Sequence, residues 1–283
     1  MHCHILRSFA AVKKLLLLAL PIWLLLSCSD YNQVLKSADA ELKFTRAVEY
    51  YNKKDYVRCY PLFEELLNLY RGTAKAEEVY YYYSYTHFGQ EDFMLAAYHF
   101  KNFSKTFPNS TRADECAYMA AYCYYLDSPE YSLDQASTYK AINELQLFID
   151  QHPKSEKVRD CTELIDKCRK KLEKKSFEIA KQYRKIEDYK SCIITMDNLL
   201  NDFPDTEFRE EALYLQLDSY YFLAMKSIES KKEQRLKETI AATYQFEKSF
   251  PNSSHIKEVR DVRTKTEEEL EKVKEVNNGL KKS

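Results

Sequence analysis

Glycine is unusually scarce in this chain, which holds only three among its 283 residues. Gly72, Gly89 and Gly279 stand far apart, whereas a loop that cradles a phosphate needs several closely spaced glycines. Turns between strands also rely heavily on glycine. The sequence therefore predicts almost no strand, and it argues against nucleotide-dependent chemistry.

An excess of either charge is also missing, because 43 basic residues face 44 acidic ones. Removal of residues 1–27, argued below, would leave 40 basic and 44 acidic residues, a net charge of −4. Nucleic-acid-binding proteins show a basic excess or stripe. The only dense basic cluster lies within residues 169–175, and a solvated helix face explains it better than a nucleic-acid partner does.

The spacings typical of metal and catalytic sites are absent as well. No HExxH segment and no distinguishable trio of Ser, His and Asp occurs, so we expect neither an enzyme nor a cofactor. Six cysteines follow Cys28, and no two of them lie two to four residues apart as zinc sites prefer: Cys59, Cys116, Cys123, Cys161, Cys168 and Cys192. Cysteines seven apart on one helix are about 10 Å apart, too far for a bridge. Buried core thiols are favoured, while a disulfide between helices and metal ligation stay open.

A tetrapeptide with a central proline recurs along the chain. Its four copies are Phe107-Pro108-Asn109-Ser110, His152-Pro153-Lys154-Ser155, Phe203-Pro204-Asp205-Thr206 and Phe250-Pro251-Asn252-Ser253, with prolines 45, 51 and 47 residues apart. Proline cannot continue a helix, and the Ser or Thr that follows can cap the next one. Each copy therefore predicts a joint between two helices, and residues 69–73 form a degenerate fifth copy.

This period predicts an all-α fold, a right-handed tetratricopeptide-like solenoid of about five helix-turn-helix repeats. The third, fourth and fifth repeats would run over residues 112–153, 160–204 and 209–251. Because the spacings exceed the usual period of about 34 residues, we expect insertions at residues 127–134 and 227–238, each a loop between the two helices of a repeat. Residues 255–283 would form a charged terminal helix, frayed near Asn277-Asn278-Gly279.

Residues 1–27 have the three parts of a secretory signal: basic residues up to Lys14, an apolar run over residues 15–26, and a small residue, Ser27. Twelve apolar residues are fewer than the roughly 20 that a membrane-spanning helix needs. The junction Leu25-Leu26-Ser27-Cys28 resembles a bacterial lipobox, so we expect cleavage before Cys28 and its lipidation. An ordinary signal peptide and an uncleaved anchor are the alternatives.

Acyl chains on Cys28 would hold the protein on a membrane without a spanning helix, since each buried CH2 contributes about 0.8 kcal/mol. Polar residues follow the cysteine, so residues 28–36 are interpreted as a tether. Ser29 is not the acidic residue associated with inner-membrane retention, and no acidic run linked to surface export follows Cys28. By analogy, we expect the periplasmic face of the outer membrane.

Aromatic residues are abundant, with 24 tyrosines and 15 phenylalanines. In the tetratricopeptide register, one helix face carries Tyr81, Tyr85 and Phe88, and the same spacing returns at Tyr118, Tyr122 and Tyr125. These rings could simply fill the seams between helices. Tyrosine also combines an apolar ring with a hydroxyl, which suits a groove for aromatic-rich peptide. Both interpretations stay open.

The mature chain resembles the BamD family of outer-membrane β-barrel assembly lipoproteins. The resemblance lies in Cys28 and in residues 47–56, 63–66, 92–93, 107–110, 141–148, 152–155 and 178–183. Single tetratricopeptide motifs are unspecific, so the order of the repeats, their lengths and the lipid anchor together carry it.

The resemblance implies a non-catalytic scaffold. Its N-terminal repeats 1–3, residues 37–153, would receive the C-terminal segments of unfolded outer-membrane proteins. Its C-terminal repeats 4–5, residues 154–254, would hold the periplasmic domains of the barrel-forming subunit. The family often has a basic residue where this chain has Thr195, so Arg209 becomes the candidate partner contact.

Two other functions remain as alternatives. A tetratricopeptide lipoprotein of the same fold could be an adaptor for peptidoglycan hydrolases or proteases. A glycan-capturing or enzymatic lipoprotein is the second, although the sequence supplies neither its loops nor its acids.

Overall fold

The computed structural model describes residues 30–280, and throughout them the secondary structure is helical with no strand. The helices are α2 (Ala40–Asn52), α3 (Tyr56–Leu69), α4 (Lys75–Gly89), α5 (Phe93–Thr106), α6 (Ala113–Leu126), α7 (Ala136–Gln151), α8 (Val158–Lys185), α9 (Tyr189–Asp202), α10 (Arg209–Met225), α11 (Glu229–Ser249) and α12 (Ile256–Leu280). The predicted all-α class is confirmed.

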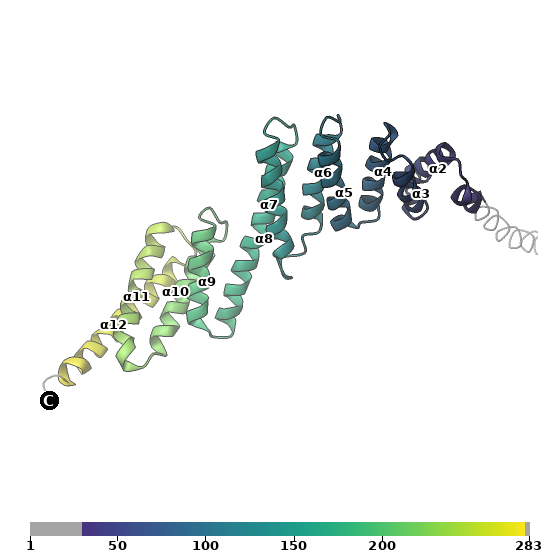
Figure 1. Ribbon diagram of the computed structural model, residues 1–283. Coiled ribbons are helices and arrows are strands. Elements are labelled where there is room, and N and C mark those ends of the chain that lie inside the picture. Colours follow the sequence, from purple (N-terminus) through teal and green to yellow (C-terminus); the bar gives the residue numbers. More distant parts are fainter. Residues whose placement is uncertain (1–29, 281–283) are drawn as a thin grey trace, which may run out of the picture. The chain divides into compact units, whose positions relative to one another are not determined.

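Helices that follow one another in the chain lie side by side as pairs (Figure 1). Two compact units result. The first comprises residues 30–129 and 136–165, and the second comprises residues 130–135 and 166–280. The pairs α2–α3, α4–α5, α6–α7, α8–α9 and α10–α11 are the five predicted repeats, which confirms the tetratricopeptide-like pattern.

Three of the four proline joints are held on both sides by their hydroxyl residue, and at the fourth the Ser253 hydroxyl accepts from the His255 amide at 3.0 Å. The Ser110 hydroxyl accepts a hydrogen bond from the Arg112 amide at 3.0 Å and donates to the Glu77 carboxylate at 2.6 Å. Ser155 bonds in the same way to the Lys157 amide and to Asp114, and Thr206 to the Phe208 amide and to Glu173. The hydroxyl therefore shapes the turn before the next helix and ties the joint to an earlier helix.

Tight turns inside the repeats follow a second pattern. Asp55, Asp92 and Asp188 cap helices α3, α5 and α9 by accepting from the backbone amide three residues on. The residue before each aspartate has a positive φ of about 60°: Lys54, Glu91 and Glu187. This turn ends one helix and begins the next within four residues, so paired helices stay close together.

The core of each unit consists of small, aliphatic and aromatic residues in the seams between helices. In the first unit, Phe63, Phe100 and Phe103 have no exposed surface, and alanines such as Ala96 allow close helix approach. In the second unit, Phe177, Cys192, Met196 and Leu199 pack between α8, α9 and α10. Burial of these apolar side chains stabilises the packing of each helix on its neighbours.

Of the two expected insertions, the first is confirmed, because residues 127–135 connect α6 and α7. The second prediction was wrong. Helix α10 ends at Met225 and α11 begins at Glu229, so the extra residues lengthen α11 to 21 residues. Residues 229–238 contain neither glycine nor proline, and Leu236 among them is fully buried, so this stretch extends the helix.

Both ends of the described chain are more ordered than the sequence suggested. Residues 30–36, expected to belong to a tether, are helical, and Val34 is buried in the first core cluster. Helix α12 continues to Leu280, past the expected fraying point. The signal segment and Cys28 lie outside the described residues. No helix of residues 30–280 is both long enough and apolar enough to cross a membrane.

Candidate peptide-binding site

The six aromatic residues that we predicted to line a peptide groove lie in one row across two helices. Helix α4 supplies Tyr81, Tyr85 and Phe88, and helix α6 supplies Tyr118, Tyr122 and Tyr125, each 37 residues after its counterpart. All six side chains are partly buried. We call these six residues the aromatic face.

Ring contacts run continuously along the aromatic face. The ring centroids of Tyr81 and Tyr85 are 4.7 Å apart, and Phe88 lies 6.4 Å from Tyr122 across the two helices. Tyr122 then stacks on Tyr118 at 5.8 Å and on Tyr125 at 6.0 Å. The structure therefore brings all the predicted groove residues together.

Glu115 of α6 fixes the α4 end of this row. The Tyr81 hydroxyl donates to its carboxylate at 2.9 Å, and the Tyr85 hydroxyl donates to the same oxygen. Burial, reinforced by the hydrogen bond to Glu115, raises the pKa of Tyr81 to about 12 and raises the pKa of Tyr85 further. These two hydroxyls are occupied within the fold, which leaves ring surface rather than hydroxyls for a ligand.

Cations border the aromatic face. The Arg112 guanidinium lies 4.4 Å from the Tyr81 ring centroid, and the Lys157 ammonium lies 5.2 Å from that of Tyr118. Lys157 is also paired with Asp160 at 3.0 Å, so Arg112 is the cation better placed for a ligand carboxylate. Partly buried rings beside this charge suit a polypeptide that carries aromatic side chains and a carboxylate.

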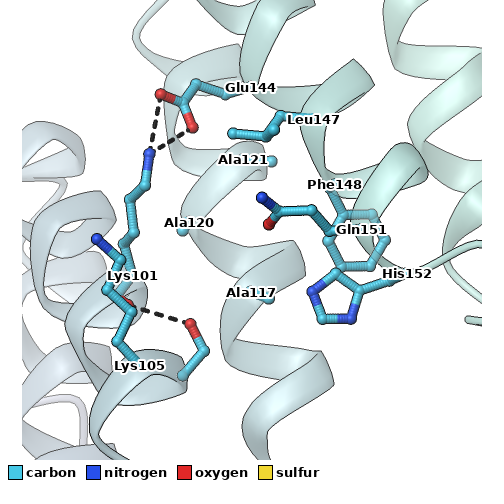
Figure 2. A pocket seen from close by; sticks show the side chains of 11 residues that line it. Lys101, Lys105, Ala117, Ala120, Ala121, Glu144, Leu147, Phe148, Gln151 and His152 are labelled. Atoms are coloured by element: carbon cyan, nitrogen blue, oxygen red, sulfur yellow. Dashed lines mark hydrogen bonds and ion pairs between the residues drawn. The ribbon is translucent and has the colours of Figure 1, made fainter. Parts of the chain in front are cut away.

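A separate cavity of about 230 Å³ lies among helices α5, α6 and α7 (Figure 2). Alanines of α6 form its floor, with Lys101, Ser104 and Lys105 of α5 on one side. On the other side lie residues of α7 and of the joint that follows it: Glu144, Leu147, Phe148, Gln151 and His152. No local sequence motif predicts this cavity. Its signal is the group Ala117, Ala120 and Ala121, where α4 has bulkier residues.

A comparison with protein-family models matches residues 36–236 to the family described as YfiO, outer membrane lipoprotein. This match covers well over half of the chain. The chain belongs to the BamD family of outer-membrane lipoproteins. No curated protein matches it significantly.

In this BamD-family chain, Arg209 lies at the start of α10 in the second unit, where its side chain is exposed. Its guanidinium donates to the Pro204 carbonyl at 3.0 Å, within the preceding joint. Thr195 is half-buried on α9. Arg209 is thus available to a partner, but nothing in the geometry singles it out.

Arg184 and Lys226 of the same unit form a second cluster of cations, the basic cluster, which the sequence did not predict. Arg184 pairs with Asp218 and lies 4.7 Å from the Phe222 ring centroid, while Lys226 pairs with Glu187 at 2.5 Å. These residues meet across 34 to 39 positions of sequence, so no local motif reveals them.

The cysteines of the described chain are free thiols, and all six are buried. Burial raises their pKa values, to about 11 for Cys59 and Cys161 and about 12 for Cys116 and Cys123. Within residues 30–280, no group of three or more His, Cys, Asp or Glu side chains could hold a metal ion. Of the three interpretations left open, the geometry fits buried core thiols.

Proposed function

We propose that this protein is a scaffold of the β-barrel assembly machinery that binds other polypeptides and catalyses no reaction. Lipidation of Cys28 would hold it on the outer membrane, facing the periplasm. Membership of the BamD family, matched over residues 36–236, is the observation that carries the proposal. The paired-helix repeats support it, because such arrays present extended surfaces for protein binding.

The N-terminal repeats, residues 37–153, receive the C-terminal segments of unfolded outer-membrane proteins. The aromatic face supports this assignment, because exposed ring surface bordered by Arg112 and Lys157 complements an aromatic side chain near a terminal carboxylate. Tyr118 and Tyr122 are the expected main contacts, because no hydrogen bond ties their hydroxyls to Glu115 in the way that holds Tyr81 and Tyr85.

The C-terminal repeats, residues 154–254, hold the periplasmic domains of the barrel-forming subunit. Exposed Arg209 and the basic cluster of Arg184 and Lys226 are the candidate contacts. The charged helix α12 belongs to the same half. Binding substrate and barrel subunit on different repeats would let one scaffold bring them together.

Depletion of the protein in its native cell tests the role directly. We expect the amount of folded barrels in the outer membrane to fall, while unchanged levels would contradict the proposal. A pull-down from detergent-solubilised membranes should recover the barrel-forming subunit. Recovery of peptidoglycan hydrolases or proteases in its place would favour the adaptor function.

Peptide binding tests the aromatic face. Tyr122→Ala should weaken binding of a ten-residue outer-membrane-protein C-terminal peptide about tenfold, equivalent to roughly 1.4 kcal/mol. Tyr139→Ala is the matched control, because Tyr139 is an exposed tyrosine of α7 outside the aromatic face. Equal affinities of the two variants, measured by fluorescence anisotropy, would remove the aromatic face from the substrate site.

A further inference from the structure

The second and third repeats differ at the positions that face the gap between neighbouring helices. Tyr80 and Tyr83 of α4 correspond, 37 residues later, to Ala117 and Ala120 of α6. Tyr83 fills the space between α3 and α5, with its ring centroid 5.8 Å from that of Tyr60 and 4.8 Å from that of His99. Tyr80 packs beside it against Phe103 at 6.1 Å.

Alanine side chains at the equivalent positions of α6 leave the space between α5 and α7 unfilled. This is the cavity of Figure 2, in which Lys101 and Lys105 lie on one side of the alanine floor and Leu147, Gln151 and His152 lie on the other. The hollow is partly open to solvent, and the preceding repeat has tyrosine rings at the equivalent positions. The cavity therefore results from the missing tyrosine rings.

The size of the cavity limits its occupant. At about 230 Å³ it is smaller than the roughly 300–1,000 Å³ of typical small-molecule sites. It suits a single large side chain of a docked polypeptide. Phe148 and His152 stack at 4.8 Å along one wall, a surface that an aromatic ring would extend.

The charges around the cavity favour an anion beside that ring. Lys101 is paired with Glu144 at 2.9 Å, and the His152 Nδ1 lies 3.0 Å from an Asp114 carboxylate oxygen. Lys105 is exposed and makes no ion pair with another described residue, and the exposed Gln151 offers amide donors across the floor. One lysine charge thus remains uncompensated at the rim.

We propose that this cavity binds an aromatic side chain of a protein partner, with the carboxylate of an acidic residue next in the partner's chain pairing with Lys105. The inference rests on the proposed role as a polypeptide-binding scaffold, and it adds a second contact site. Tyr118 packs on the cavity-lining Phe148 at 5.9 Å, so the two sites are neighbours. Ala117 and Ala120 lie on a different face of α6 from Tyr122, so substitutions at these positions distinguish the two sites.

Two matched dipeptides test the proposal on the purified full chain: acetyl-Phe-Asp-amide and acetyl-Phe-Asn-amide, which differ only in charge. Ligand-observed NMR should show tighter binding of the aspartate form. Lys105→Met should weaken that form about two- to fivefold, the range expected of a partly exposed ion pair, and leave the asparagine form unchanged. Lys53→Met, an exposed lysine of the first repeat, is the matched control.

A variant that fills the cavity provides the second arm. Ala117→Tyr restores the residue of the preceding repeat and should abolish binding of both dipeptides, with circular dichroism confirming the fold. Undiminished binding to this variant, or equal affinity of the two dipeptides for the native chain, would overturn the proposal. Neither result would change the expected outcome of the depletion and pull-down experiments. The cavity proposal can therefore fail while the scaffold proposal stands.

Discussion

Six buried free thiols raise the question of what protects these cysteines from oxidation. Each of the six lies in a helix seam, and burial raises the pKa of Cys116 and Cys123 to about 12. At neutral pH almost no thiolate forms, and the thiolate is the species that reacts. Seam packing rather than the redox environment therefore protects these residues.

We expect iodoacetamide to leave the six cysteines unmodified in the native protein at pH 7.5 and to modify all six rapidly in urea. Mass spectrometry of the detergent-solubilised protein measures both. Lys53→Cys supplies an exposed thiol as a positive control. Modification of a native cysteine, or a mass lower by that of two hydrogens, would contradict the seam assignment.

A stacked histidine pair makes the first unit sensitive to acid. The imidazoles of His87 and His99 stack at 4.9 Å beneath Tyr83, and neither ring nitrogen of His87 has a hydrogen-bond partner. Burial lowers the pKa of His87 and lowers that of His99 to about 4, with the neighbouring imidazole adding to the second shift. Both rings are therefore neutral in the folded protein at pH 7.

Because the folded-state pKa values lie below the unfolded value of about 6.5, the unfolded chain binds more protons as pH falls. The free energy of unfolding should decrease between pH 6.5 and about 4. Urea titrations at several pH values measure this. The double variant His87→Phe and His99→Phe should have a shallower dependence over that window, and an identical slope would refute the role of the pair.

At the scale of the helix, the proline joints connect elements far apart in sequence. Thr206 and Glu173 are both buried, and the Thr206 hydroxyl donates to that carboxylate. Ser155 and Asp114 make the equivalent bond at 2.6 Å, but the Asp114 side chain is 48% exposed. The same bond is therefore worth more in the second unit, because water cannot replace it there.

Thr206→Val should lower the free energy of unfolding by about 2–3 kcal/mol, because it leaves a buried carboxylate without its donor. Ser155→Ala should cost less than about 1 kcal/mol. Urea unfolding of both variants provides the comparison. If Glu173→Met added to Thr206→Val did not restore most of the loss, the unpaired carboxylate would not be its cause.

Helices whose ends are set by neighbouring residues were predictable from the sequence, whereas helix ends that depend on contacts between distant residues were not. The joints follow from proline and a hydroxyl residue that act locally, so helix order was correct. The aspartate caps, in Asp55-Tyr56, Asp92-Phe93 and Asp188-Tyr189, are also local features, although they were not predicted. The prediction of a loop over residues 227–238 was wrong, because the burial of Leu236 depends on α12, which lies later in the chain.

The candidate site shows the same division. The shared face of Tyr81, Tyr85 and Phe88 followed from helical periodicity. The capture of two tyrosine hydroxyls by Glu115 depends on a contact 30 to 34 residues away, which periodicity does not report. The alanine-floored cavity required comparing one repeat with the next, because an alanine is informative only where its counterpart is a tyrosine.

At the scale of the whole molecule, the family match ends at residue 236, within α11. Beyond it, α12 packs on α11 and α10 through Val259, Leu270 and Val273, each less than 8% exposed. Its other residues are mainly charged. A helix with one apolar stripe and a polar outer face is what the last unit of a repeat array needs to end its core in water.

Removing residues 256–283 should therefore destabilise the second unit by several kcal/mol, since burial of each of three large apolar side chains contributes about 1.5–3 kcal/mol. The deletion would also expose Leu236 and Phe246, which are now covered. Because stability in repeat proteins is transmitted between neighbours, α10 and α11 should lose protection most and α2–α5 least. Hydrogen exchange of the full and shortened chains measures this gradient, and a uniform loss across both units would contradict the assignment of α12 as a local cap.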